Sequence, residues 1–313
     1  MSYVEIRNLY KNYGDNQVLK NVSFEIENGE RFGLIGPNGA GKSTLIDVMT
    51  GLTPLNSGEV FIDGRKVPKD IVKIRERIGL VPQEIALMQE LNAPSNLEYF
   101  GGLYGLSGKT LKNRIDEALE IVGLEDQQKK AVKTFSGGMQ RRLNIAAGIL
   151  HRPELLILDE PTVGVDPQSR NKIFEFIKYM NEEYKTTVLY TSHYMEEVEA
   201  LCERLFILDN GEQVGYGAQE EIKQLVQDNV KWLIEVEQLP LGIEDELQAE
   251  LIGVEQVVIE NNKLHMIVDP LEFSIQQLMQ YFTKKNLELT TLKKEELSLE
   301  EAFLQLTGKT LRD

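Results

Sequence analysis

A glycine-rich stretch at residues 36–44 constrains the fold of this chain more than any other feature. It reads, in order, Gly36, Pro37, Asn38, Gly39, Ala40, Gly41, Lys42, Ser43 and Thr44. The apolar run Phe32–Ile35 precedes it, and the segment Leu45–Met49, which reads as a helix, follows it. Gly-x4-Gly-Lys-Ser spacing between a buried strand and a helix is typical of a phosphate-binding loop, the P-loop. The stretch therefore predicts an α/β fold with a phosphate site.

The residue types in this loop suit the binding of a nucleoside triphosphate. Glycine permits backbone turns that a Cβ would forbid, so successive N–H groups can point at one anion. The helix that follows adds unpaired N–H groups and the positive end of its dipole. Lys42 is expected to reach the β- and γ-phosphates, and the Ser43 hydroxyl to ligate Mg²⁺. The expected ligands are therefore ATP and Mg²⁺.

Composition limits the classes of function. The formal net charge is −16, from 34 basic and 50 acidic residues. Such a surface repels phosphate backbones, so general nucleic-acid binding is not expected, and ATP must be held by local geometry. Cys202 is the single cysteine, which rules out an internal disulfide and suits a small core residue. The N-terminus does not resemble a signal peptide, and no run approaches 18 uncharged apolar residues, so a cytoplasmic or peripheral protein is expected.

Two carboxylates follow another apolar run. Leu155–Leu158 reads as a buried strand, and Asp159 and Glu160 come directly after it. Charged residues rarely follow four buried aliphatic residues without a task, which disfavours a surface ion pair here. Open α/β sheets bind ligands at the carboxyl ends of their strands. Asp159 is therefore expected to reach Mg²⁺, directly or through a water molecule, and Glu160 to lie at the γ-phosphate.

Two further polar residues stand at the ends of predicted strands. Gln83 follows the strand Ile78–Val81, and His193 follows the strand Thr187–Tyr190. A lone glutamine or histidine at such a place is most often solvated. Histidine at a strand end can also contact the γ-phosphate and hold the attacking water.

A second anion-binding segment is predicted within the helical region 91–150. Its residues are Ser136, Gly137, Gly138, Met139 and Gln140, and they open a helix. Free N–H groups at a helix start can bind an anion, but Ser-Gly-Gly is also an ordinary capped helix start. Tyr13, before the turn at 14–16, also has two interpretations. Its ring can stack on a purine, or it can pack against neighbouring side chains of the protein.

The pattern changes near residues 227–229. We therefore expect a first domain at 1–227 and a smaller α+β domain at 228–313. The latter reads as strand, helix, strand, strand, helix, strand, an order that suggests a ferredoxin-like layer. It has no glycine-rich loop or ligand cluster, so regulation or assembly is expected of it.

Together, the motifs resemble the nucleotide-binding subunit of an ATP-binding-cassette (ABC) transporter over residues 3–227. The set consists of the P-loop, Gln83, Ser136–Gly138, Asp159–Glu160, Asp166 and His193 in one order. The resemblance implies a P-loop NTPase cassette with a RecA-like core, an antiparallel β subdomain and a helical subdomain at about 91–150.

The resemblance also assigns roles to individual residues. It makes Tyr13 the adenine-stacking aromatic and Gln83 the residue that touches Mg²⁺ and senses the membrane partner. Residues 136–140 become the signature, Asp166 the D-loop aspartate and His193 the switch histidine. Signatures of the family usually begin Leu-Ser-Gly-Gly-Gln, whereas Phe135 and Met139 flank the matched residues here, and Val165 replaces a common leucine in the D-loop.

The tail Ser298–Gly308 is similar to the ending of bacterial exporter ATPases of the daunorubicin-resistance and sodium-efflux type. That similarity implies a separate ABC-2-type permease as membrane partner, a homodimer or paired ABC subunit, and a position at the cytoplasmic face of the membrane. The transported substrate would contact the permease.

Other classes of ABC protein make different predictions for this sequence. An importer ATPase is the alternative, because cassette motifs do not set the direction of transport. A soluble ABC protein of DNA repair would carry a long coiled coil between Lys42 and Ser136, and no sustained heptads occur there. Translation factors of the family carry two cassettes, and a regulatory module without turnover would be expected to lack Glu160 or His193.

Overall fold

The computed structural model describes residues 2–226, 230–237, 239–240, 242–261, 263–295 and 297–308. Contacts divide the chain into two compact units. The first unit runs to Gln219 and also takes the segment from Leu306 onward, and the second unit is Glu220–Gln305. The expected domain boundary at 227/228 lies outside the described residues and stays a prediction. Within the described residues, no helix is long and apolar enough to cross a membrane.

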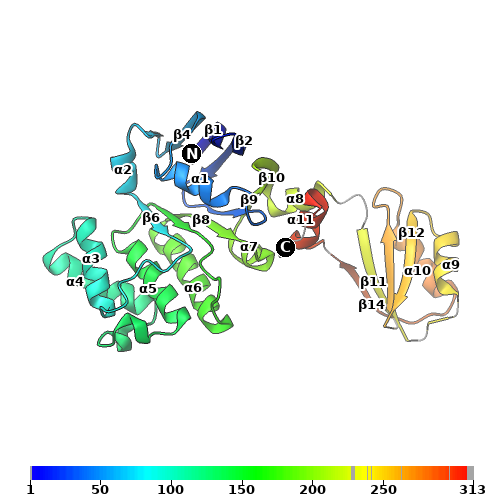
Figure 1. Cartoon of the computed structure of the whole chain (residues 1–313). Helices are drawn as coiled ribbons and strands as arrows, with labels where there is room; N and C mark the ends of the chain where they lie inside the picture. The colour runs from blue at the N-terminus through cyan, green and yellow to red at the C-terminus, as the bar shows by residue number, and fades with distance from the viewer. Residues whose placement is uncertain are drawn as a thin grey trace. The chain divides into compact units, whose positions relative to one another are not determined.

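A six-stranded sheet forms the centre of the first unit (Figure 1). Its spatial order is β10-β9-β3-β8-β7-β6. The strands are β3 (Arg31–Ile35), β6 (Ile78–Val81), β7 (Leu155–Leu158), β8 (Thr187–Ser192), β9 (Arg204–Asp209) and β10 (Glu212–Ala218). All neighbours are parallel except β9 and β10. Parallel strands are covered on both faces, which explains why every residue of β7 and β8 is buried.

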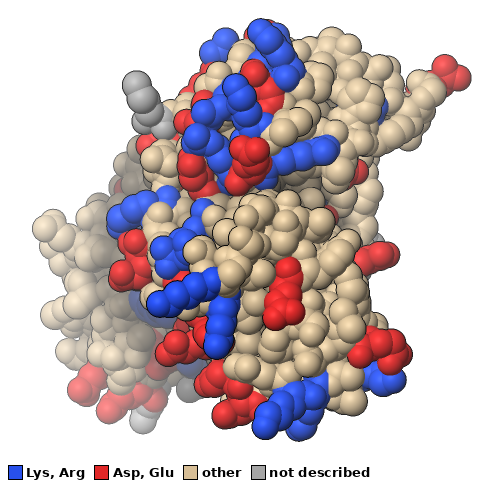
Figure 2. Space-filling model, turned by 90° about the vertical axis from the view of Figure 1, so that its left-hand side faces the viewer, with Lys and Arg blue, Asp and Glu red and all other residues tan. Residues whose placement is uncertain are grey.

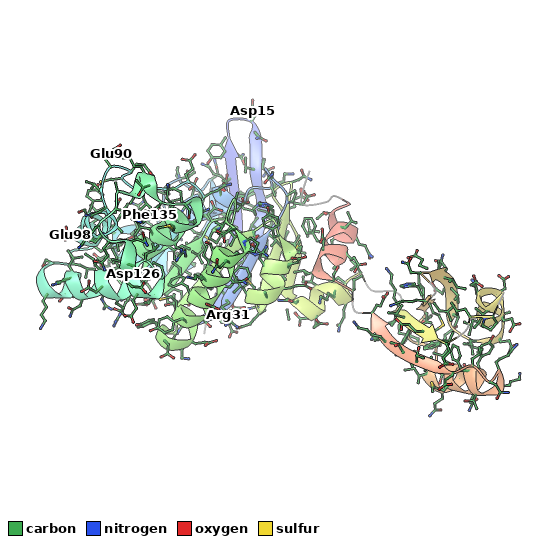
Figure 3. All side chains as sticks on the ribbon, turned by 90° about the horizontal axis from the view of Figure 1, so that it is seen from below. Asp15, Arg31, Glu90, Glu98, Asp126 and Phe135 are labelled. Atoms are coloured by element: carbon green, nitrogen blue, oxygen red, sulfur yellow. The ribbon has the colours of Figure 1, made fainter. Side chains whose placement is uncertain are left out.

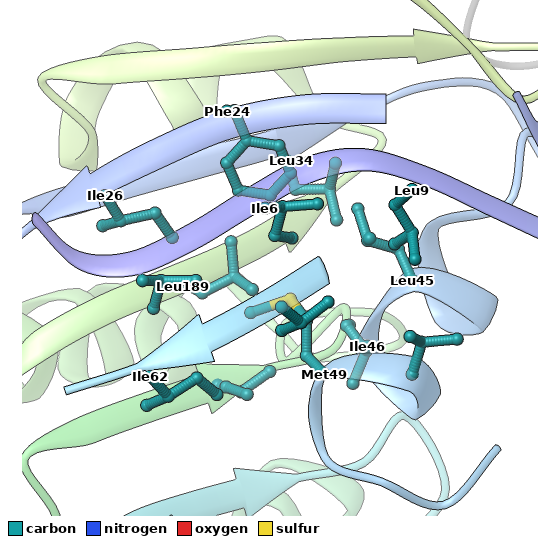
Figure 4. Close-up of a cluster of buried hydrophobic side chains, with 14 of the residues drawn as sticks. Ile6, Leu9, Phe24, Ile26, Leu34, Leu45, Ile46, Met49, Ile62 and Leu189 are labelled. Carbon is teal, nitrogen blue, oxygen red and sulfur yellow. The ribbon is translucent and has the colours of Figure 1, made fainter. Parts of the chain in front are cut away.

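A second sheet is antiparallel, in the order β2-β1-β4-β5. Its strands are β1 (Ser2–Tyr13), β2 (Asn16–Glu27), β4 (Ser57–Ile62) and β5 (Arg65–Val67), and the short helix α2 (Ile71–Arg75) follows. Apolar side chains from this sheet, the central sheet and α1 (Lys42–Met49) form one core cluster (Figure 4). Phe24, Leu34 and Leu45 come from these three elements in turn. This shared core fixes the start of α1 against the ends of the central strands.

The helical region lies between β6 and β7 in sequence. It contains α3 (Ala93–Leu103), α4 (Gly108–Ile121), two short 3₁₀ turns at Glu125–Gln127 and Val132–Thr134, and α5 (Gly137–Ile149). The Asn92 side chain caps α3 by accepting from Ser95 N, which explains where that helix starts. Figure 3 shows Phe135 among these helices and Asp15 at the tip of the β1–β2 hairpin. The helices α6 (Pro167–Tyr184) and α7 (Met195–Leu201) complete the cassette. The expected P-loop cassette with three parts is thereby confirmed.

The second unit contains a four-stranded antiparallel sheet in the order β12-β13-β11-β14. Its elements are β11 (Val230–Val236), α9 (Ile243–Glu250), β12 (Val254–Glu260), β13 (Lys263–Val268), α10 (Ile275–Lys284) and β14 (Leu289–Glu295). The helices α8 (Gln219–Gln224) and α11 (Leu299–Thr307) cross the two points in the sequence at which the units divide. The strand and helix order with this pairing is the ferredoxin-like arrangement. Ile234, Met266 and Phe282 are among the buried residues of its own core.

Candidate active site

The P-loop connects β3 to α1 and depends on two glycines. A Cβ at Gly36 would lie 2.2 Å from the Leu208 carbonyl oxygen, so only glycine lets the loop pass β9 at this point. Gly41, the residue before α1, has φ 110°, which favours glycine. The sequence thus brings the backbone N–H groups at the start of α1 to the carboxyl end of β3.

Lys42 is buried at the start of α1. Its Nζ donates to the carbonyl oxygens of Gly36 and Pro37 at 2.7 and 3.3 Å, and lies 3.6 Å from Glu160 Oε1. Burial lowers the pKa of Lys42, while the carboxylates of Glu160 and Asp159 oppose that shift. The side chain is therefore held over the loop by oxygen atoms, the type of partner that a phosphate also offers.

Glu160 is the residue on which the predicted site residues converge. Gln83 Nε2 donates to its Oε2 at 3.2 Å, and His193 Nδ1 lies 3.3 Å from the same oxygen. Gln83 and His193 thus meet at Glu160, although neither is near it in sequence. The Glu160 cluster is defined here as Lys42, Gln83, Asp159, Glu160 and His193.

The backbone of Glu160 is unusual. Its φ is 46°, in the left-handed region that non-glycine residues seldom adopt. Thr191 Oγ1 accepts a hydrogen bond from its N–H at 2.9 Å, and Arg141 Nη2 donates to its carbonyl oxygen at 2.6 Å. Such backbone strain persists only where surrounding contacts enforce it, and it is common at functional sites.

Asp159 and Ser43 stand side by side. Ser43 Oγ donates to Asp159 Oδ2 at 3.3 Å, and Thr191 Oγ1 donates to Asp159 Oδ1 at 2.8 Å. Burial raises the pKa of Asp159, and the adjacent Glu160 adds to that shift. Among the described residues, no group of three or more His, Cys, Asp or Glu side chains is arranged to hold a metal. The pair of Ser43 and Asp159 nevertheless supplies oxygen donors beside the P-loop, the donor type that Mg²⁺ takes alongside phosphate and water.

Tyr13 lies at the end of β1, and its side chain is 49% exposed. Lys11 Nζ lies 4.7 Å from the centre of the Tyr13 ring and donates to the Pro54 carbonyl oxygen at 2.7 Å. Lys11 therefore occupies one side of the ring by a cation–π contact.

Within the described residues, side-chain hydrogen bonds of the signature segment, Ser136–Gln140, stay within the start of α5 or join it to Phe135 and Gln89. Ser136 caps α5 by accepting from Met139 N at 3.3 Å, and Gln140 Nε2 donates to the Phe135 carbonyl oxygen at 3.3 Å. A Cβ at Gly138 would lie 2.5 Å from Ser169 Oγ, whereas a Cβ at Gly137 would meet open space. Over the described residues, no hydrogen bond or ion pair joins this segment to the Glu160 cluster.

Asp166 caps α6. Its Oδ1 accepts from Ser169 N at 2.9 Å, and this hydrogen bonding lowers the pKa of Asp166. The contact that the structure shows for Asp166 is therefore that of a helix cap, and its role as the D-loop aspartate stays a prediction.

Sequence reasoning missed Arg141, which joins the signature helix to the Glu160 cluster. Besides the Glu160 carbonyl, the guanidinium donates to the carbonyl oxygens of Pro161 and Pro82, both at 2.8 Å. One side chain of α5 thus holds the backbone beside both Gln83 and Glu160. The only signal in the sequence is an arginine within a helix whose other residues are mostly apolar or small.

Comparisons with known proteins agree with this geometry. A family model described as ABC transporter matches residues 19–163. The linearmycin resistance ATP-binding protein LnrL of Bacillus subtilis is 43% identical over 319 residues, covering 99% of this chain and 100% of the relative. The daunorubicin resistance ATP-binding protein DrrA3 of Streptomyces coeruleorubidus is 33% identical over 307 residues, covering 96% and 95%. A solved ATP-binding cassette in a dimeric post-hydrolysis state, bound to ADP and Pi, is 31% identical with a TM-score of 0.63, covering 69% of this chain and 98% of that one.

Proposed function

Because this chain belongs to the ABC transporter family and is one of its ATP-binding ATPase subunits, we propose that it works as a dimer that powers export through a separate permease. The observation that carries the proposal is the convergence of Lys42, Gln83 and His193 on Glu160. These residues combine a phosphate-binding cation with a carboxylate that can act as a base.

The proposed hydrolysis is an in-line attack of water on the γ-phosphate. Glu160 takes the proton of the water as general base, and His193 positions the water and the γ-phosphate. Lys42 stabilises the charge on the transferred group. Ser43, Asp159 and Gln83 would hold Mg²⁺, which would supply positive charge to neutralise the phosphates. Tyr13 offers its uncovered ring face to the adenine.

We further propose that the signature completes the site of a second subunit. Ser136 and the free N–H groups at the start of α5 can bind an anion, and Gly137 leaves room for one. A two-fold dimer then contains two identical sites. In each site, one subunit supplies the P-loop and the Glu160 cluster, and the other subunit supplies the signature and Asp166. Tight closure around ATP and opening after hydrolysis can move an attached permease between two states.

The permease is proposed to dock at the cavity of about 570 Å³ in the first unit. Pro82, the neighbour of Gln83, lines this cavity together with Leu52, Phe100 and Leu103. Leu103 is 67% exposed, and such an apolar side chain at a cavity rim suits a protein partner. Figure 2, which faces this side of the first unit, shows uncharged surface between scattered basic and acidic side chains. Docking there places the subunit at the cytoplasmic face of the membrane.

Co-purification tests the proposal. Expressed with its permease, the chain is expected to remain bound through detergent extraction, and the complex to hydrolyse MgATP faster than the isolated subunit. Leu103→Asp is expected to abolish co-purification, whereas Leu271→Asp, at a residue of the second unit that is 93% exposed, serves as the matched control. Equal retention of both variants contradicts the docking site, and a complex without MgATP turnover contradicts the proposed function.

A further inference from the structure

A buried carboxylate outside the Glu160 cluster has no part in the roles assigned above. Glu197 lies in α7 and is only 2% exposed. Its Oε2 accepts three hydrogen bonds, from Thr162 Oγ1 at 2.7 Å, from Tyr190 Oη at 2.8 Å and from Ser192 Oγ at 2.7 Å. Burying a carboxylate costs much free energy unless it is hydrogen-bonded or paired with a cation. The three hydroxyls therefore stabilise the buried Glu197 carboxylate.

The network contains hydroxyl donors and no cation. Among the described residues, no Lys, Arg or His forms an ion pair with Glu197, and its Oε1 has no hydrogen-bond partner. Burial and the neighbouring carboxylate of Glu197 raise the pKa of Tyr190 well above its ordinary value, so its hydroxyl stays a donor. The hydroxyls of Thr162, Tyr190 and Ser192 therefore all donate to a single acceptor atom, Glu197 Oε2.

The donors come from the two segments that carry catalytic groups. Thr162 is two residues after Glu160, and Ser192 directly precedes His193. Ser192 Oγ also accepts from Tyr194 N at 2.9 Å, which closes the turn around His193. The network thus fixes the backbone on both sides of the 3.3 Å approach between Glu160 Oε2 and His193 Nδ1.

We propose that Glu197 is a positioning residue for ATP hydrolysis. By accepting from Thr162 and Ser192 at one oxygen, it ties the segment after Glu160 to the turn of His193, and so keeps the carboxylate and the imidazole together at the γ-phosphate. This inference rests on the proposed roles of Glu160 and His193, and it adds a residue that acts through both of them.

The first variant is Glu197→Gln in the full-length chain. Glutamine has nearly the same size, but its amide group puts two donors where Oε1 has no partner. The kcat for MgATP is expected to fall roughly 10- to 100-fold, the range for a small misplacement of reacting groups. ATP affinity is expected to stay unchanged, because the P-loop makes that contact. Glu196→Gln removes the same charge from an exposed position of α7 and is expected to keep wild-type kcat.

A double-mutant cycle separates positioning from a general loss of structure. If Glu197 acts through His193, Glu197→Gln lowers kcat in the wild-type chain and has no further effect when His193→Ala is already present. Equal fold losses in both backgrounds, or wild-type kcat for Glu197→Gln alone, overturn the inference.

Two controls complete the test. If Glu197→Gln does not fold by circular dichroism, Thr162→Val takes its place in the cycle, and Thr162→Ser, which keeps the hydroxyl, is expected to restore kcat. Glu160→Gln is assayed in parallel. If it is inactive while Glu197→Gln has wild-type kcat, the positioning role alone fails; if Glu160→Gln is fully active, the proposed base fails and the positioning role fails with it.

Discussion

The Glu160 cluster and the signature segment are both made of motif residues, but they differ in what they contact. Three side chains from separate segments meet at the Glu160 carboxylate within 3.2–3.6 Å. The signature residues make hydrogen bonds within their own helix start and with Phe135 and Gln89, and over the part of the chain that the structure describes none joins them to that carboxylate. One region is assembled within a single chain, while the other presents free backbone donors. The difference suggests that the signature serves a second subunit.

Lys42→Ala is expected to have the largest effect, because it removes the cation that the P-loop offers to the phosphates. Turnover should fall at least ~1000-fold, the upper range for losing one preorganised donor, and ATP affinity should fall as well. A steady-state ATPase assay and nucleotide titration measure both. Lys109→Ala, at an exposed position in α4, is the matched control. Near-normal turnover in Lys42→Ala would contradict the proposed role of the Glu160 cluster in ATP hydrolysis.

Glu160→Gln should keep the shape of the cluster and remove its base. Turnover is expected to fall at least ~100-fold while ATP still binds. Size-exclusion chromatography with MgATP should show more dimer than for the wild type, because the closed state cannot react. Adding Ser136→Arg should abolish that dimer. A trapped dimer that tolerates the arginine would contradict a role for the signature in closure.

Tyr13→Ala should have a smaller effect, confined to the binding of the adenine base of ATP. ATP affinity is expected to fall roughly 3- to 10-fold, as for the loss of one aromatic stacking contact, and Tyr13→Phe should bind normally. Binding of inorganic tripolyphosphate, which has no base, is the control and should not change. If Tyr13→Ala also weakens tripolyphosphate, the ring acts through the loop structure.

Removing residues 228–313 should have the least effect on the Glu160 cluster, because all five of its residues lie between Lys42 and His193, in the first unit. We expect a folded cassette that binds ATP with unchanged affinity. Near-UV circular dichroism and nucleotide titration measure this. A molten or insoluble fragment would show that the two-domain division is wrong.

Much of the fold could be predicted because strands, glycine turns and helices follow from local patterns. The apolar run before Asp159 and the spacing of Gly36–Ser43 predicted the strand ends and the P-loop, and the fold class and ATPase activity are confirmed. The roles of individual site residues stay predictions. The ferredoxin-like order of the second unit followed from strand and helix periodicity alone.

The remaining features depend on tertiary packing. The three carbonyl partners of Arg141 lie 19, 20 and 59 positions away, so no local pattern reveals them. The left-handed backbone of Glu160 is likewise unpredictable, because glutamate has no preference for that region. Glu197 is one of three glutamates in α7, and its hydrogen bond from Thr162 spans 35 positions, so no local pattern distinguishes it from the other two.

The most direct measurement is complementation between two inactive variants. Lys42→Ala removes the P-loop cation, and Ser136→Arg blocks the signature, so each homodimer should lack ATPase activity. In a mixed dimer, one site combines an intact P-loop with an intact signature, and the other has both defects. Mixing the two folded variants, with the permease present, should therefore restore a portion of wild-type ATPase activity. If mixed dimers form and no activity returns, or if Ser136→Arg alone is fully active, the composite site is contradicted.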